Sequence, residues 1–279
     1  MAGQTDAIKL LVLDIDGTLA GESNQVEAPV IEAIRAVQAK GIQVAIATGR
    51  MYGSALRFHQ AVGSTLPLMA YQGAYIKDPL TQTLYRHTPL PRNYALALLA
   101  ELTPMELDQQ LSIHLYIDDR LHVREIIEDT KDYAARSQVD PVAAGDLSTF
   151  LNTNAAIQTT KLLALSAEPA LVTTLLNQLR QLYPPSELYF TSSTTNFFEV
   201  THPQANKGAA VKYIAEELLD LRADQVMTVG DNFNDLEMLQ YAGIGVAMGD
   251  APDGVKTAAD WVAPSVEDHG VAAAIEEFL

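Results

Sequence analysis

The chain has 279 residues, of which 48% are hydrophobic and 19% charged, a composition typical of globular proteins with about two domains and not of disordered chains. Its 18 Lys and Arg residues against 35 Asp and Glu residues give a net charge of −17, so we expect no nucleic-acid or membrane partner, because both are bound through clustered basic residues. The absence of cysteine excludes disulfide scaffolds and thiolate chemistry, and the lack of a leader pattern or a long apolar run favours a cytoplasmic protein.

The N-terminal part of the chain alternates short apolar runs with patterns of helical spacing. Runs of strand length cover 8–13, 42–47 and 67–70, and helical patterns cover 26–40 and 55–62. Near-continuous apolar strands separated by helices predict a parallel sheet that is covered by helices on both faces. Polar residues that follow such strands gather at the carboxyl edge of the sheet, where ligands of open α/β sheets bind.

The pattern changes after Gly73. A predicted hairpin at 75–85 precedes helices at 94–102 and 169–182, which alternate with antiparallel-looking strands at 112–116, 120–126, 161–165, 187–191 and 196–201. The first pattern then resumes, with helices at 207–219, 234–241 and 271–278 and strands at 226–229 and 244–248. We therefore expect an α/β fold, in which a Rossmann-like parallel-sheet core at 1–86 and 191–279 is interrupted by an inserted α+β domain at 87–190.

The segment Asp14-Ile15-Asp16-Gly17-Thr18 directly follows the first predicted strand. Residues i and i+2 of an extended segment project to the same side, so the carboxylates of Asp14 and Asp16 are expected to meet at the strand end. Gly17 permits a sharp turn, and Thr18 offers a hydroxyl there. A solvated turn is the alternative for this segment alone, since Asp, Gly and Thr are common in turns.

Three further segments place polar groups at the ends of predicted elements. Gly230-Asp231-Asn232-Phe233-Asn234-Asp235 follows the strand at 226–229 and opens a helix, whose N-terminus favours anions. Thr48-Gly49-Arg50 offers a hydroxyl and backbone N–H groups after the second strand. Lys207 lies at a predicted helix start, where the helix dipole disfavours a cation. Taken singly, these segments also fit a capped helix, a loop and a solvated lysine.

Taken together, the four segments make an electrostatic argument. Their four Asp residues would repel one another at one site unless a cation joined them. Oxygen ligands without nearby Cys or His favour Mg²⁺, which takes one or two carboxylates together with phosphate oxygens and waters. An entering phosphate dianion would need the donors and the positive charge that Thr48 and Lys207 can supply. Asp can also attack phosphorus as a nucleophile, so the residues predict phosphoryl transfer.

In this order, the four segments resemble the four motifs of the haloacid dehalogenase-like phosphatases. The inserted domain lies between the second and third motifs, which is similar to the Cof-type subfamily with a type IIB cap. The likeness continues in Val246-Ala247-Met248-Gly249, Ala258-Ala259-Asp260 and Glu267-Asp268-His269-Gly270-Val271-Ala272. Gln72 stands where many members of the family have Asn. For the cap, the resemblance rests on position and element pattern.

The resemblance implies a role for each matching residue. Asp14 would attack phosphorus to form an aspartyl-phosphate, and Asp16 would protonate the leaving group and then act as base on water. Mg²⁺ would be held by Asp14, the backbone carbonyl of Asp16, and Asp231. The other matching residues would bind the phosphoryl oxygens (Thr48, Gly49, Lys207 and Asn234), reach the substrate (Arg50), or order the metal waters and Lys207 (Asp235).

We therefore expect a Mg²⁺-dependent phosphatase, with sugar phosphates favoured by the resemblance. The expected partner is a small-molecule phosphate ester, and the expected oligomeric state is a monomer or homodimer. A phosphotransferase or phosphomutase of the same fold, similar to phosphomannomutases, is an alternative that differs in what accepts the phosphoryl group. A non-catalytic phosphometabolite-binding protein is a second alternative, but it would be expected to lose Asp14, Asp16, Lys207 or Asp231, and all four are present.

Overall fold

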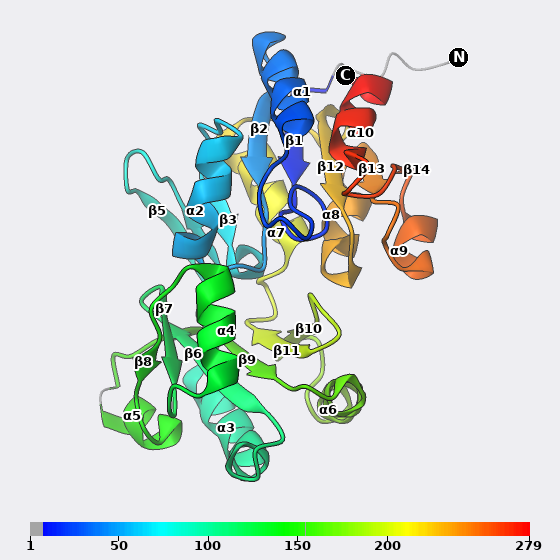
Figure 1. Cartoon of the computed structure of the whole chain (residues 1–279). Coiled ribbons are helices and arrows are strands. Elements are labelled where there is room, and N and C mark those ends of the chain that lie inside the picture. Colours follow the sequence, from blue (N-terminus) through cyan, green and yellow to red (C-terminus); the bar gives the residue numbers. More distant parts are fainter. Residues whose placement is uncertain (1–7, 154) are drawn as a thin grey trace. The chain divides into compact units, whose positions relative to one another are not determined.

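The computed structural model describes residues 8–153 and 155–279 of the chain (Figure 1). The chain divides into two compact units. The first unit contains the chain up to Arg50, Ala55–Arg86 and Asn206–Leu279, and the second contains Met51–Ser54 and His87–Ala205. Among the described residues, no helix combines the length and the apolar character needed to cross a membrane.

The first unit is built on a five-stranded sheet in which every pair of neighbouring strands is parallel, which confirms the expected α/β fold. In spatial order its strands are β14 (Trp261–Val262), β13 (Ile244–Ala247), β12 (Val226–Gly230), β1 (Leu10–Leu13) and β2 (Gln43–Ile46). All four residues of β1 are buried, as expected for a strand with a neighbour on each side and helices on both faces. The register pairs Leu13 with Val229, so the segments that follow β1 and β12 leave the sheet at the same edge.

Helices cover this sheet. They are α1 (Ala28–Ala39), α2 (Tyr52–Ala61), α7 (Lys207–Lys212), α8 (Leu236–Tyr241), α9 (Asp253–Ala258) and α10 (Gly270–Phe278). Figure 1 shows α1 and α10, which pack on each other, in front of the sheet. Leu10 and Val12 of β1 share a core cluster with Ala210 and Val211 of α7, so the alternation of the strand directs the other β1 residues to the opposite face. The helix expected at 207–219 is α7 followed by a π-helical segment, Tyr213–Leu218.

The third predicted strand does not join the parallel sheet as a full member. β3 (Leu68–Ala70) lies in a separate three-stranded sheet with β4 (Tyr75–Lys77) and β5 (Leu84–His87), and β3 and β4 are antiparallel. An isolated parallel bridge between Ala47 and Met69 connects β3 to the end of β2. The reason is that the hairpin after Gly73 offers β3 a complete partner strand, whereas the end of β2 offers it one pairing position.

The second unit is a six-stranded sheet in the order β10-β11-β9-β6-β7-β8. Its strands are β6 (Ser112–Ile117), β7 (Arg120–Val123), β8 (Val142–Ala143), β9 (Thr159–Leu165), β10 (Tyr189–Thr191) and β11 (Phe197–Thr201), and its helices are α3 (Arg92–Leu107), α4 (Glu128–Ser137), α5 (Leu147–Thr153) and α6 (Pro169–Leu182). α3, α5 and α6 bury one face in an apolar cluster. α4 contacts the opposite face, where the ring of Tyr133 lies 4.9 Å from that of His114.

The border between the units differs from the predicted one at 190/191. Residues as far as Ala205 belong to the second unit. The reason is that β11 pairs along its length with β9, with Phe198 opposite Ala164, and β10 pairs with β11. The sequence pattern shows that 196–201 is a strand, but it does not show which sheet this strand joins.

Candidate active site

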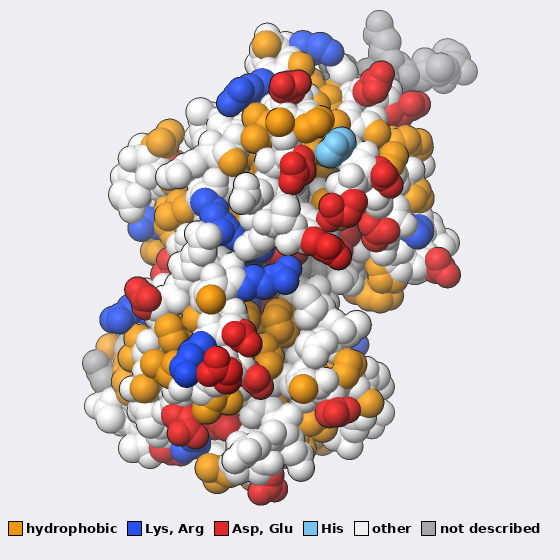
Figure 2. All heavy atoms as spheres, viewed as in Figure 1, with side chains coloured by type: hydrophobic (Ala, Val, Ile, Leu, Met, Phe, Trp, Pro, Cys, Tyr) orange, Lys and Arg blue, Asp and Glu red, His pale blue; other side chains and the backbone are white. Residues whose placement is uncertain are grey.

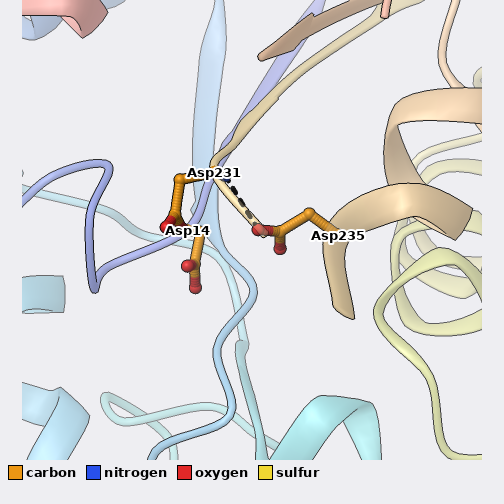
Figure 3. A group of neighbouring side chains, drawn as sticks. All are labelled: Asp14, Asp231 and Asp235. Carbon is orange, nitrogen blue, oxygen red and sulfur yellow. Dashed lines mark hydrogen bonds between the residues drawn. The ribbon is translucent and has the colours of Figure 1, made fainter. Parts of the chain in front are cut away.

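Two carboxylates come together at the carboxyl edge of the parallel sheet. Asp14 follows β1, and Asp231 follows the adjacent strand β12. The backbone N–H of Asp14 donates to the carbonyl of Val229 at 3.1 Å, which continues the pairing with β12 beyond the end of β1. Figure 3 shows the side chains of Asp14, Asp231 and Asp235 as one group, and one oxygen from each lies within 4.8 Å of the others. Asp14 is 4% exposed, so its charge is largely removed from water.

The turn after β1 makes this approach possible. Gly17 has a φ of 76°, which favours glycine, and a Cβ at this position would lie 2.3 Å from Oδ2 of Asp231. Glycine is therefore required here both by the backbone conformation and by the close carboxylate. Thr18 is also buried, and its hydroxyl has no hydrogen-bond partner among the described residues.

Lys207 supplies the positive charge of the group. It is fully buried, and its Nζ lies 2.7 Å from Oδ1 of Asp14 and 2.5 Å from Oδ1 of Asp235. The other oxygen of Asp235 accepts hydrogen bonds from the backbone N–H groups of Asp231 and Asn232, at 2.9 and 3.1 Å; the first of these is the dashed line in Figure 3. Because both oxygens of Asp235 are engaged, Asp14 and Asp231 are the side chains of this group that are best placed to bind a metal.

The site carries more negative charge than Lys207 offsets. Burial raises the pKa of Asp14 to about 7, and the charge of Asp235 adds to this effect while Lys207 opposes it. Burial and the charges of Asp235 and Asp14 raise the pKa of Asp231 to about 9. Burial lowers the pKa of Lys207, but the two carboxylates outweigh it and hold this pKa above its ordinary value. Buried carboxylates with raised pKa values and hard oxygen donors suit a divalent cation such as Mg²⁺.

Asp16 is not one of the three carboxylates that lie within 4.8 Å of one another, but its charge also helps to raise the pKa of Asp14 and of Asp231. Its two oxygens accept hydrogen bonds from Nε and Nη2 of Arg50, at 2.8 and 2.6 Å. The side chain of Asp16 is 43% exposed. β1 ends at Leu13 and Ile15 lies in a turn, so Asp16 is placed by this turn and not by an extended strand.

Arg50 also forms a hydrogen bond with a residue that was not predicted for the site. Its Nη2 donates to Oδ1 of Asn24 at 2.8 Å, and its guanidinium lies 4.6 Å from the ring centroid of Phe58. Asn24 lies in an irregular loop, and no spacing in the sequence connects it to Arg50. The neighbouring Thr48 is fully buried, and its hydroxyl accepts the backbone N–H of Arg50 at 3.1 Å.

Asn234 lies beside a second residue that was not predicted for the site. Its Nδ2 donates to Oε1 of Gln72 at 3.2 Å, and both side chains are buried. Gln72 belongs to the short helical turn Tyr71–Gly73 that follows β3. In the sequence, Gln72 differs from the Asn that many members of the family have at this position. No sequence pattern predicts that its side chain contacts Asn234.

Comparisons with known proteins agree with this geometry. A family model described as haloacid dehalogenase-like hydrolase matches residues 11–275. Phosphatase YwpJ of Bacillus subtilis is 28% identical, over 98% of this chain and 100% of that protein. Pyridoxal phosphate phosphatase YbhA of Escherichia coli is 28% identical, over 91% and 92% of the two chains.

Solved structures show the same fold. The structure of a haloacid dehalogenase-like hydrolase from B. subtilis matches with a TM-score of 0.85 and 25% identity, over 98% of this chain and 100% of that one. Because the matched region includes both units, the likeness covers the parallel sheet and the six-stranded sheet alike.

Proposed function

The chain belongs to the haloacid dehalogenase-like hydrolase family and is a phosphoric monoester hydrolase, and we propose that it is a Mg²⁺-dependent phosphatase of small phosphorylated metabolites that works through an aspartyl-phosphate on Asp14. The observation that carries the proposal is the position of Lys207, buried between Asp14 and Asp235 with Asp231 beside them. This arrangement combines a nucleophile with the positive charge that a phosphate dianion needs.

In the first half of the proposed reaction, a carboxylate oxygen of Asp14 attacks phosphorus. The bond from phosphorus to the ester oxygen breaks, and Asp16 donates a proton to the departing alkoxide. Lys207, the Thr48 hydroxyl, the Gly49 N–H and Asn234 hold the phosphoryl oxygens. Both oxygens of Asp16 accept from Arg50 in the structure, so this ion pair must loosen before Asp16 carries and donates a proton.

In the second half, water attacks the phosphorus of the aspartyl-phosphate. Asp16 takes a proton from that water, the bond between phosphorus and Asp14 breaks, and inorganic phosphate leaves. Asp14, Asp231 and the backbone carbonyl of Asp16 would hold Mg²⁺, with Asp235 ordering Lys207 and the metal's waters. When bound, the ion offsets the negative charge of the carboxylates and of the phosphoryl group.

We propose sugar phosphates as the first substrates to test, together with other small esters such as pyridoxal phosphate, the substrate in the name of a relative. With Mg²⁺ the chain is expected to release phosphate from several of these compounds, and with EDTA in place of Mg²⁺ from none of them. Release that persists in EDTA would overturn the metal dependence. Isomer formation from a bisphosphorylated sugar, without net phosphate release, would overturn hydrolysis in favour of a phosphomutase.

The affinity for Mg²⁺ is expected to rise with pH. Metal ligands must be deprotonated, and the pKa values of Asp14 (about 7) and Asp231 (about 9) are raised, so protons compete with the metal below these values. Calorimetric titration of the protein with Mg²⁺ alone, from about pH 6 to about pH 9, measures the effect without turnover. Asp231→Asn should bind Mg²⁺ weakly at every pH. An affinity in the unmodified protein that does not change with pH would contradict the assignment of these ligands.

A further inference from the structure

Gln72 is held in a backbone conformation that side chains rarely adopt. Tyr71, Gln72 and Gly73 have φ values of 53°, 59° and 87°, so three consecutive residues lie in the left-handed region, two of them not glycine. Backbone hydrogen bonds hold this turn to the loop after β2, because the N–H of Tyr71 donates to the carbonyl of Arg50 and that of Gln72 to the carbonyl of Thr48, both at 2.9 Å. Such strain persists only where the surroundings determine the conformation, and it is concentrated at functional sites.

The strained turn buries an amide with an unused donor. The side chain of Gln72 is fully buried, and its Oε1 accepts the hydrogen bond from Asn234. Its Nε2 has no hydrogen-bond partner among the described residues, and neither has Oδ1 of Asn234. Buried N–H groups without a partner are rare in folded proteins, because they lose their bonds to water and gain none in return.

The unused donor lies beside Gly49. A Cβ on Gly49 would be 2.5 Å from Nε2 of Gln72, so the absence of a side chain at Gly49 is what allows the amide to lie there. The amide therefore lies between two segments that are proposed to hold the phosphoryl group, the Thr48-Gly49 loop and Asn234. An anion at this position would give the two N–H groups of Nε2 the acceptor that they lack.

We infer that Gln72 is a further binding and positioning residue for the transferring phosphoryl group. Its Nε2 donates to a phosphoryl oxygen beside the Gly49 N–H, and its Oε1 orients Asn234 so that the Nδ2 of Asn234 faces the same group. This inference rests on the proposed function, because it adds a donor to the same phosphoryl site.

Gln72 could instead have a purely structural role, in which its side chain only connects the turn after β3 to the loop after β12. This role and that of a phosphoryl donor predict different behaviour of matched variants. Gln72→Glu keeps the size of the side chain and an oxygen that accepts from Asn234, but it replaces the donor by an oxygen that repels phosphate when ionised. Gln72→Leu removes both functions and keeps a similar volume. A structural tie would leave Gln72→Glu close to the unmodified protein and impair Gln72→Leu, whereas a phosphoryl donor makes Gln72→Glu the more damaging change.

The test is the dissociation constant of inorganic phosphate, measured by calorimetry with saturating Mg²⁺ on the full chain, together with kcat and KM. For Gln72→Glu we expect phosphate binding to weaken about ten- to hundredfold, as for the loss of a hydrogen bond to a charged group. The dissociation constant of phosphate for Gln72→Glu, divided by that for the unmodified protein, should increase with pH as the introduced carboxyl ionises. A structural role would not produce this increase. Gln72→Asn, a shorter amide, should retain part of the affinity.

Gln38→Glu is the matched control. The Nε2 of Gln38 donates to the carbonyls of Val62 and Gly63, at 3.0 and 3.2 Å, and it lies in α1, away from the residues proposed to hold the phosphoryl group. This variant should bind phosphate like the unmodified protein. Phosphate binding by Gln72→Glu within about twofold of the unmodified value, at every pH, would overturn the inference.

The inference and the proposed function fail in different ways. If the unmodified chain releases phosphate and Gln72→Glu is unaffected, only the role of Gln72 is wrong. If the unmodified chain binds phosphate but hydrolyses no ester, the proposed function is wrong and the binding series still decides the role of Gln72. If it neither binds phosphate nor hydrolyses an ester, both are wrong. Should Gln72→Glu not fold, the comparison of Gln72→Asn with Gln72→Leu decides, because only the former retains a donor.

Discussion

Phosphate release is expected to fall at least about a thousandfold when Asp14 is replaced by asparagine, because the amide is a very weak nucleophile toward phosphorus. The substitution keeps the shape of the side chain, which matters because Asp14 is 4% exposed. It also removes the negative charge that lies 2.7 Å from Lys207. The measurement is the rate of phosphate release at saturating substrate and Mg²⁺, with thermal unfolding followed by circular dichroism to show that the variant is folded.

Asp260→Asn is the control for this loss. The carboxylate of Asp260 accepts the backbone N–H of Gly245 at 2.8 Å in the same unit, so the variant tests the removal of an exposed, hydrogen-bonded carboxylate away from the site. It should release phosphate at close to the unmodified rate. If Asp14→Asn kept more than about a tenth of that rate, attack by Asp14 would be contradicted. Label from a radioactive phosphoryl group should also remain on the acid-quenched unmodified protein and not on Asp14→Asn.

Lys207→Met is expected to reduce kcat/KM at least about a hundredfold and to lower the free energy of unfolding without Mg²⁺ by about 3 kcal/mol. The fully buried ammonium lies between Asp14 and Asp235, and methionine fills a similar volume without charge. The change therefore removes the proposed phosphoryl contact and leaves buried carboxylates without their cation. Because Mg²⁺ binds the folded state, its addition should restore more stability to this variant than to the unmodified protein.

The stability of Lys207→Met should also depend more steeply on pH. A carboxyl whose pKa is raised in the folded protein destabilises it as pH rises from the ordinary value near 4 through the folded value. In the unmodified protein this applies to Asp14, with a pKa of about 7, and to Asp231, with a pKa of about 9. Removal of Lys207 raises both values further, so denaturant titrations should show a larger loss between about pH 5 and about pH 9 in the variant.

Lys212→Met is the matched control on the same helix. Its Nζ lies 3.8 Å from Glu216, and its side chain is 60% exposed, so its ion pair contributes at most about 0.5 kcal/mol. We expect Lys212→Met to have the same free energy of unfolding and the same turnover of substrate as the unmodified protein. A similar loss of stability in both variants, or a Lys207→Met variant that remains fully active, would contradict the argument that the buried charge balance governs this site.

Much of the core could be predicted from local patterns. The apolar runs at β1, β2, β12 and β13 are short and nearly continuous, which is the signature of parallel strands with both faces buried. Two of the predicted site segments follow the adjacent strands β1 and β12 directly, so their meeting at one edge follows from the parallel topology. The exact limits of α6, Pro169–Leu182, were also predicted, because its leucines recur at helical spacing after a proline.

The sheet to which a strand belongs was harder to predict from the sequence. The segment 197–201 has the composition of a strand wherever it pairs, and it joins β9 of the second unit because of a pairing between residues distant in the chain. β3 likewise takes β4 as its partner and contacts the parallel sheet through the Ala47–Met69 bridge. Strand propensity is a local property, whereas partner choice depends on long-range packing.

By itself, the sequence predicted which chemical groups would serve phosphoryl transfer and which of them follow a strand, because apolar periodicity and turn residues act over a few neighbouring positions. Only the tertiary structure decided how these groups pair. It placed Lys207 between Asp14 and Asp235, turned Asp16 toward Arg50, and buried the amide of Gln72 against Asn234. These contacts join residues far apart in the chain, and the direction of each side chain depends on turns and packing that no local pattern contains.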